Sequence, residues 1–299
     1  MIQYDPHNWL DHLFDVKGSV LLDIIGRVAL VTVWALVITV FHHKVFPVGY
    51  PSTMHTLVGV ALGLLLVIRT NASYERFWEG RRLWGGIVNE SRNLARSAAA
   101  FLPARSPAFE PVVLWTIAFA YSSMHSLRGE ANIGPVAERL PAEEVKEVLA
   151  SRHVPTAVSL RISRLLAAAR REGVSDYVAL AVDNNVQQLI DYVGGCERIL
   201  KTPLPFAYVV HLRRALIVYG VTLPFALVDA YGWFTVLDTF IITYILFGID
   251  EIGVEIEGPF GGDDNDLPLE DICATIERNL LGLLEERAAP EVLTKGAGA

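Results

Sequence analysis

The chain has 299 residues, of which 52% are hydrophobic, and a formal net charge of -8. Its mean hydropathy of +0.37 is high for a water-soluble protein of this length, so we expect membrane-spanning segments. The acidic balance argues against a nucleic-acid-binding protein, which would carry a basic patch on one face. The two cysteines, Cys196 and Cys273, imply neither a disulfide framework nor a multi-cysteine metal site.

The first twenty residues lack the basic segment and the small-residue cleavage site of a secretory signal, so we expect them to belong to the mature protein.

The first strongly apolar segment covers residues 24–46. As a helix it is long enough to cross roughly 30 Å of hydrocarbon. Arg27 and Lys44 lie near its ends, where their side chains can reach the interface.

The second segment, residues 54–78, begins apolar and becomes cationic and aromatic with no turn between the two halves. Its apolar part is shorter than the roughly 20 residues of a lipid-exposed crossing. We therefore expect an unbroken helix that starts in the membrane, shielded by other helices, and continues into water. Four aromatic residues near the transition are expected at the level of the lipid headgroups: Tyr74, Phe77, Trp78 and Trp84.

Two further membrane helices are predicted over residues 206–228 and 231–249. The first of them contains His211, Arg213, Arg214 and Pro224, so it cannot face lipid all round, and its basic residues are expected to face the interior or the inner leaflet. The second contains one charged residue, Asp238. Gly232 is expected to end the tight turn between the two helices.

The orientation follows from the distribution of basic residues. The link before the second segment carries none, whereas six arginines follow its apolar part: Arg69, Arg76, Arg81, Arg82, Arg92 and Arg96. Cytoplasmic loops are enriched in such residues, so we expect residues 79–205 and 250–285 to be cytosolic. With four crossings of a cell (inner) membrane, both termini then lie on the cytoplasmic side.

The cytosolic region is predicted to be helical throughout. Apolar residues recur at three- and four-residue spacing over residues 107–129, 141–152, 156–173 and 175–200, and no strand pattern or internal repeat is evident. Gly129, Gly173 and the Gly194–Gly195 pair are expected to mark helix ends. The small and polar tail, residues 286–299, is expected to be disordered. The fold class is therefore an all-α, polytopic membrane protein.

Three motifs in order resemble the bacterial members of the bestrophin family of ion channels. They are IRTNASYERFWEGRRLWG at residues 68–85, DNNVQQLIDYVGGCERILKTPLPFAY at residues 183–208, and GPFGGDDNDLPLEDICATIERNLL at residues 258–281. The resemblance extends from Phe14 to Leu281 and covers one channel unit, residues 1–285. It implies an all-helical pentamer around one central pore, with a membrane half and a cytosolic half in each subunit.

Val60, Leu64 and Ile68 fall where this family places its pore neck. Their four-residue spacing puts them on one helix face, so several copies would form stacked apolar rings. Gly59 and Gly63 beside them form a small-xxx-small pair suited to close helix contact. The alternative is that the three apolar residues serve ordinary helix packing.

The resemblance also implies a second narrowing at the cytosolic exit, at Tyr177 with Asp176 beside it. The alternative, compatible with the first, is that Ser175 or Asp176 caps a helix N-terminus.

Animal bestrophins carry a calcium clasp at the third motif. Asp263 and Asp266 match its carboxylate ligands, and Gly258 matches a backbone-carbonyl position. The spacing is not that of an EF-hand, and Gly262 and Asn265 interrupt the acidic run. A loop that caps the following helix is the interpretation we favour. If the clasp is present, a backbone carbonyl near Gln3 is a further expected ligand.

The sequence thus favours a passive ion channel over two other classes. It has no nucleophile elbow, phosphate-binding loop or HExxH motif of an enzyme, and no inverted repeat of a secondary transporter. The expected partners are further copies of the chain, membrane lipid and permeant inorganic ions, with no required cofactor and calcium as an option.

Ion preference is a separate expectation. A ring of Asp176 in an acidic assembly favours small cations such as sodium, which some bacterial relatives conduct. Chloride, which eukaryotic relatives conduct, is the alternative.

Overall fold

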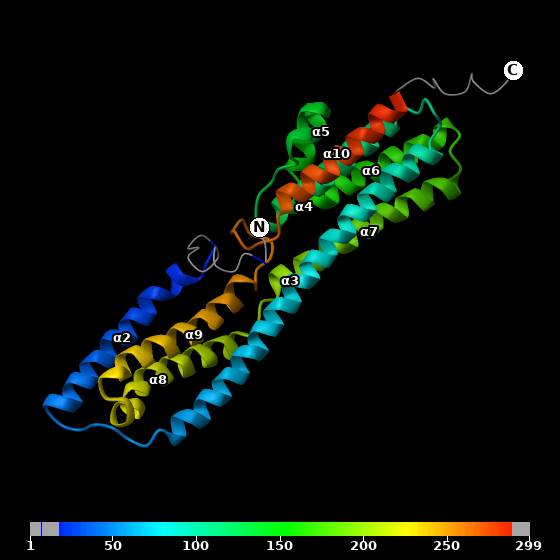
Figure 1. Cartoon of the computed structure of the whole chain (residues 1–299). Helices are drawn as coiled ribbons and strands as arrows, with labels where there is room; N and C mark the ends of the chain where they lie inside the picture. Colours follow the sequence, from blue (N-terminus) through cyan, green and yellow to red (C-terminus); the bar gives the residue numbers. More distant parts are fainter. Residues whose placement is uncertain (1–6, 8–17, 289–299) are drawn as a thin grey trace. The chain divides into compact units, whose positions relative to one another are not determined.

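The structure of the chain is a computed structural model that describes residue 7 and residues 18–288 (Figure 1). Every regular element in these residues is a helix, which confirms the all-α prediction. The chain divides into two compact units. The first unit comprises residues 1–78 and 202–266, and the second comprises residues 79–201 and 267–299.

The first unit contains α2 (Leu21–Lys44), the beginning of α3 (Thr53–Phe101), α8 (Phe206–Tyr231) and α9 (Thr235–Glu255). Within residues 18–288, three helical stretches are long and apolar enough to cross a membrane: Leu21–Lys44, Thr53–Phe101 and Phe206–Glu255. The last stretch contains both α8 and α9, so each of the four predicted segments corresponds to one helix. The bounds differ, because α2 ends at Lys44 and not at residue 46, and α9 begins at Thr235 and not at residue 231. α3 is unbroken from its apolar start to Phe101, as predicted.

The turn between α8 and α9 is made by a short 3-10 helix, η3 (Gly232–Phe234). Gly232 has a φ of 54°, a left-handed conformation that favours glycine. It follows α8 directly and begins the turn, whereas the sequence predicts it at the end of the turn. Pro224 is accommodated inside α8. After the turn, α9 runs back beside α8, so that Phe247 near the end of α9 packs in one cluster with Leu212 near the beginning of α8 (Figure 1).

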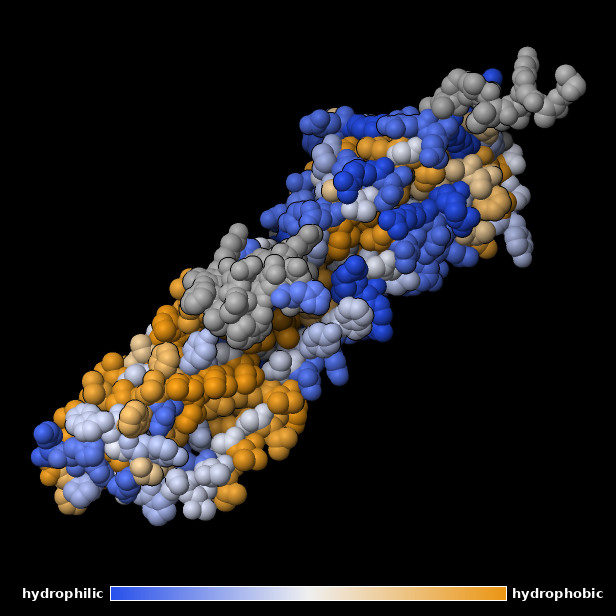
Figure 2. All heavy atoms as spheres, viewed as in Figure 1, coloured by the Kyte–Doolittle hydropathy of each residue, from blue (hydrophilic) through white to orange (hydrophobic). Residues whose placement is uncertain are grey.

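One apolar cluster holds the four helices of this unit together. It contains residues from each of them: Ile24, Val28, Val31, Leu62, Leu66, Leu212, Leu216 and Phe247. The opposite faces of the same helices are also apolar but exposed, as at Leu30 (74% exposed) and Ile217 (58%). Hydrophobic residues cover much of the visible face of this unit in Figure 2. Such a surface is expected in hydrocarbon or against another subunit, because water-soluble monomers rarely carry it.

A buried ion pair joins α3 to α9. Arg69 is 1% exposed and Asp250 is 2% exposed, and the guanidinium contacts the carboxylate. Removing one partner of such a pair leaves a charge without compensation and typically costs about 3–5 kcal/mol. The pair therefore fixes how α3 is rotated against α9.

The second unit is built around α4 (Phe109–Leu127). Every residue of α4 from Val112 to Met124 is buried, as expected for the central helix of a bundle. The hydroxyl groups of Thr116, Ser122 and Ser123 donate to carbonyls of the same helix, as where Thr116 donates to the carbonyl of Val112 at 2.7 Å. The surrounding elements are the rest of α3, η1 (Pro135–Arg139), α5 (Ala142–Leu149), α6 (Val154–Ala169), η2 (Arg170–Glu172), α7 (Asp176–Lys201) and α10 (Leu269–Ala288).

Local signals explain several helix starts in this unit. α5 follows Pro141 and has Glu143 and Glu144 in its first turn, where carboxylates interact favourably with the helix dipole. α6 has Pro155 in its first turn, and the His153 side chain accepts a hydrogen bond from the Thr156 amide.

Both cysteines lie in this unit, free and buried, Cys196 in α7 and Cys273 in α10. Burial raises the pKa of each thiol to about 12, so both are protonated at neutral pH.

The prediction that Gly194–Gly195 ends a helix is wrong, because the pair lies inside α7. A Cβ on Gly195 would lie 2.8 Å from Leu83 Cδ2, and a Cβ on Gly86 would lie 2.6 Å from the Tyr192 ring. Gly195 and Gly86 therefore let α3 and α7 approach closely in the second unit. Gly129 and Gly173, with φ values of 76° and 94°, do follow helix ends.

Two further expectations are corrected. Trp84, expected at the membrane interface, is fully buried, whereas Tyr74 and Trp78 are more than half exposed. Glu286 and Arg287, expected in the disordered tail, belong to α10. The Arg287 guanidinium donates to the carbonyl of Pro103 at 2.7 Å and lies 4.1 Å from the centre of the Phe109 ring. Residues 289–299 lie outside the described residues.

We predict that Gly86→Ala destabilises the protein, whereas Gly85→Ala does not. The methyl group at Gly86 would overlap the Tyr192 ring, and overpacking of this kind typically costs about 1–3 kcal/mol. At Gly85 the methyl group would meet only the flexible end of Arg81, at 3.6 Å, and alanine is the better helix former by about 1 kcal/mol. Thermal melting of the purified variants measures the difference, and equal melting temperatures would contradict the close approach.

Candidate functional site

The three residues predicted for the pore neck lie together on one exposed face of α3. Val60, Leu64 and Ile68 are 64%, 61% and 56% exposed. On the other side of the helix, Leu62 and Leu66 are 2% and 1% exposed and belong to the apolar cluster. Ordinary packing within the subunit therefore does not account for the three residues.

Contacts with α8 hold α3 in this orientation. The Tyr208 hydroxyl donates to the carbonyl of Leu65 at 2.9 Å. A Cβ on Gly59 would lie 2.9 Å from the Tyr219 hydroxyl, so Gly59 allows α8 to approach. A Cβ on Gly63 would meet nothing within 4 Å. Of the predicted small-residue pair, Gly59 makes a close contact with another described residue and Gly63 does not.

Within the second unit, the exposed charged residues of α3 are basic. They are Arg81, Arg82, Arg92 and Arg96, while Trp84, Ile87 and Leu94 on its other side are buried. Clustered cations of this kind raise the local concentration of anions.

Tyr177 and Asp176 lie at the beginning of α7, as the two compatible interpretations require. The Tyr177 side chain is exposed, and the residue as a whole is 87% exposed. The Ser175 hydroxyl accepts a hydrogen bond from the Val178 amide at 3.3 Å, so Ser175 acts as the cap. The Asp176 carboxylate lies 2.6 Å from the Arg170 guanidinium. Its negative charge is therefore partly compensated, and the role of Tyr177 at an aperture stays a prediction.

The loop of the third motif is closed by its own aspartates. The Asp263 amide donates to Asp266 Oδ2 at 2.8 Å, and the Asp266 amide donates to the carbonyl of Asp263 at 3.0 Å. Asp266 is 4% exposed, whereas Asp263 is exposed. A Cβ on Gly261 would lie 2.5 Å from Asp266 Oδ2, so this turn requires glycine there, whereas a Cβ on Gly258 would have open space.

These hydrogen bonds give the loop a structural role, and they do not test calcium binding. Calcium takes six to eight oxygen ligands. Among the described residues, no group of three or more His, Cys, Asp or Glu side chains could hold a metal ion. The expected carbonyl ligand near Gln3 lies outside the described residues. Calcium binding at Gly258, Asp263 and Asp266 therefore stays a prediction.

Sequence reasoning missed the pairing of Arg69 with Asp250. In the sequence, Arg69 is one of six arginines that indicate orientation, and Asp250 lies just beyond the last predicted membrane segment. Charged residues within or beside apolar helices are the signal that could have indicated a pair, since they are rarely left alone there.

Comparison with known proteins confirms the family resemblance. The model of a family described as "Bacterial/Fungal Bestrophin protein" matches residues 1–282. A voltage-dependent anion channel-forming protein of Nostoc sp. is 36% identical, with 91% of each chain covered. One of Ralstonia nicotianae is 37% identical, with 93% of this chain and 94% of the relative covered.

Among solved structures, the crystal structure of a bacterial bestrophin homologue from Klebsiella pneumoniae superposes with a TM-score of 0.82 at 34% identity. The superposition covers 88% of this chain and 98% of that chain. On sequence and structure alike, the chain belongs to the bacterial and fungal bestrophin family.

Proposed function

We propose that this protein is the subunit of an anion channel in the inner membrane. The observation that carries the proposal is the exposed apolar face at Val60, Leu64 and Ile68, on a helix whose other side is packed into the apolar cluster. A neck of stacked apolar rings is a known way to gate a pore, because a narrow apolar constriction resists wetting.

A stripe on a single helix cannot enclose water, so the pore requires several copies in a closed ring. The resemblance leads us to propose five. Each subunit would cross the membrane four times, through α2, α3, α8 and α9, with both termini in the cytoplasm. The channel would need no cofactor, and calcium would be at most a stabilising ligand of the loop at Asp263–Asp266.

The expected preference for cations is not supported, and we propose anions instead. The relatives of Nostoc sp. and Ralstonia nicotianae are named as anion channel-forming proteins. The Asp176 carboxylate, on which the cation argument rested, is paired with Arg170. The exposed charged residues of α3 in the second unit are arginines. Each of these observations favours the chloride alternative.

The proposal is tested by reconstitution. Protein whose oligomeric mass has been measured in detergent is inserted into a planar bilayer under a KCl gradient. We expect unitary current steps that need no coupled substrate, with a reversal potential close to the equilibrium potential of chloride. A stable monomer in detergent would contradict a channel. So would a protein that passes current only when a coupled substrate is added. Reversal near the potassium potential would restore the cation interpretation.

A second experiment tests the neck. Replacing Val60, Leu64 and Ile68 together by alanine should widen the constriction and increase the current, because less apolar surface then opposes wetting. A matched control replaces Leu237, Ile241 and Ile245 of α9, which have the same spacing and are 52%, 43% and 50% exposed. The control should conduct as the wild type does. Equal currents in all three proteins would remove the stripe from the pore.

A third experiment tests the cytosolic aperture. Tyr177→Ala should admit larger permeant anions, because a bulky ring no longer narrows the exit. Asp176→Asn should increase the permeability ratio of chloride to potassium, since a negative charge is removed and Arg170 loses its partner. Leu180→Ala, one turn further along α7 and 64% exposed, is the control. Permeability sequences identical to that of the wild type would place Asp176 and Tyr177 away from the conduction path.

A further inference from the structure

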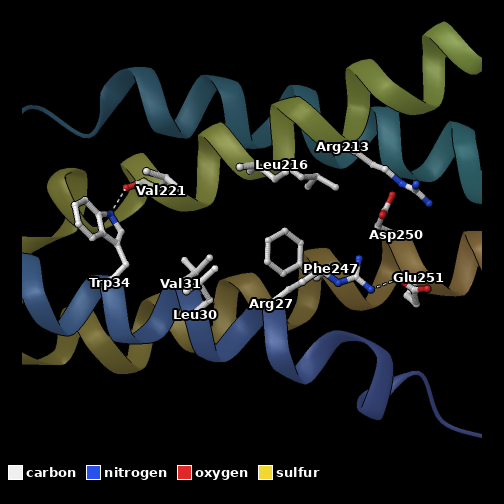
Figure 3. A pocket seen from close by; sticks show the side chains of 11 residues that line it. Arg27, Leu30, Val31, Trp34, Arg213, Leu216, Val221, Phe247, Asp250 and Glu251 are labelled. Atoms are coloured by element: carbon white, nitrogen blue, oxygen red, sulfur yellow. Dashed lines mark hydrogen bonds and ion pairs between the residues drawn. The ribbon is translucent and has the colours of Figure 1, made fainter.

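A groove of about 720 Å³ opens between α2, α8 and α9 in the first unit (Figure 3). Much of its wall is apolar and is formed by Leu30, Val31, Trp34, Leu216, Ile217 and Val221. Its other end is charged and is formed by Arg27, Arg213, Asp250 and Glu251. The groove therefore has one apolar end and one charged end.

All the charged residues lie towards the same end of the helix bundle. Arg27 is near the beginning of α2, Arg213 is near the beginning of α8, and Asp250 and Glu251 are near the end of α9. Trp34 follows Arg27 by two turns of α2, which corresponds to about 10 Å along the helix axis. This is the end of the bundle where we expect the cytoplasmic leaflet, because Arg69 and Arg76, the first two of the six arginines that indicate orientation, contact Asp250 and the carbonyl of Glu257 there.

Both carboxylates of the groove are paired with arginines other than Arg213. Arg27 is paired with Glu251, and Asp250 contacts the buried Arg69. Arg213 is exposed and makes no hydrogen bond or ion pair with another described residue. Arg27 and Arg69 thus take up the two carboxylates of the groove, and Arg213 is the arginine of its lining that has no partner among the described residues.

We propose that this groove binds an anionic phospholipid of the cytoplasmic leaflet. Its phosphate lies at Arg213, and one acyl chain lies along Leu30, Trp34 and Ile217. A guanidinium recognises phosphate oxygens with two parallel hydrogen bonds, and the interaction is stronger where water is scarce. The cytoplasmic leaflet is the one that carries anionic headgroups.

The apolar end offers an acyl chain a fixed wall. The Trp34 indole N–H donates to the carbonyl of Val221 at 2.9 Å, so its polar atom is already bonded and its ring is held in place (Figure 3). Ile217 and Leu30 are 58% and 74% exposed. A lipid satisfies both ends of the groove at once, which a purely apolar partner helix would not do.

The test measures lipid retention and not current, so its outcome is independent of ion selectivity. Purified protein is equilibrated with vesicles of equimolar phosphatidylglycerol and phosphatidylcholine, extracted in mild detergent, and its retained lipid is quantified by mass spectrometry. We expect phosphatidylglycerol to be enriched about tenfold in the wild type, which is equivalent to about 1.4 kcal/mol. Arg213→Gln should abolish this enrichment.

Arg214→Gln is the matched control. Arg214 is the next residue and is also exposed, but it lines a separate groove with Tyr50, Met54 and His55. Its variant should keep the enrichment. Equal retention of the two lipids by the wild type, or unchanged enrichment in Arg213→Gln, would overturn the proposal.

A second variant keeps the proposal testable if Arg213→Gln fails to fold. Ile217→Trp fills the apolar end and should reduce the total lipid retained without affecting the charged end.

A cysteine variant tests whether a neighbouring subunit occupies the groove instead. If Ile217→Cys is protected from a membrane-soluble maleimide in protein stripped of lipid, a neighbouring subunit covers the groove. That result would assign the groove to subunit contact and would also overturn lipid binding.

Discussion

The pairing of Arg69 with Asp250 is the interaction on which the arrangement of the first unit depends. Neither charge is stable alone in an apolar interior, so α3 and α9 can pack in this unit only with these two residues facing each other. Ile68 precedes Arg69 by one position and therefore points about a quarter of a turn away. Burying Arg69 thus turns the apolar stripe outward. A buried ion pair in this way determines which face of α3 is exposed.

Close packing supports the same arrangement without charge. Gly59 admits the Tyr219 hydroxyl, and in the second unit Gly86 and Gly195 admit Tyr192 and Leu83. At Gly59 and Gly86, a side chain of α8 or α7 lies against the backbone of α3. At Gly195, the Leu83 side chain of α3 lies against the backbone of α7. Helix α3 therefore makes close packing contacts at several points along its length. These contacts hold it in place, and its apolar part alone is short for a lipid-exposed crossing. Such a helix suits a pore lining, which must be held rigidly by the rest of the subunit.

Most of the helices could be predicted from the sequence because their signals are local. The length of apolar runs indicated α2, α8 and α9, and the absence of Pro or a turn signal after Ile68 indicated that α3 is unbroken. Non-local features could not be predicted. The Gly194–Gly195 pair resembles a helix end until Leu83 is known to lie against it, and the end of α10 appears disordered by composition until Arg287 is known to reach Pro103. The candidate site could be predicted in part. The four-residue spacing of Val60, Leu64 and Ile68 places them on one helix face, and the family resemblance implies their role in a neck. The Arg69–Asp250 pair and the groove could not be predicted, because they join segments that are distant in the sequence.

The burial of both cysteines has a practical consequence for studying this channel. With a pKa of about 12, each thiol has almost no reactive thiolate at neutral pH, and both side chains are shielded from reagents in the folded subunit. The natural chain therefore behaves towards maleimides and methanethiosulfonates as a nearly cysteine-free background. Single cysteines can be introduced along α3 one position at a time, and the accessibility of each position can be mapped without first removing Cys196 or Cys273 and disturbing the cores that they fill.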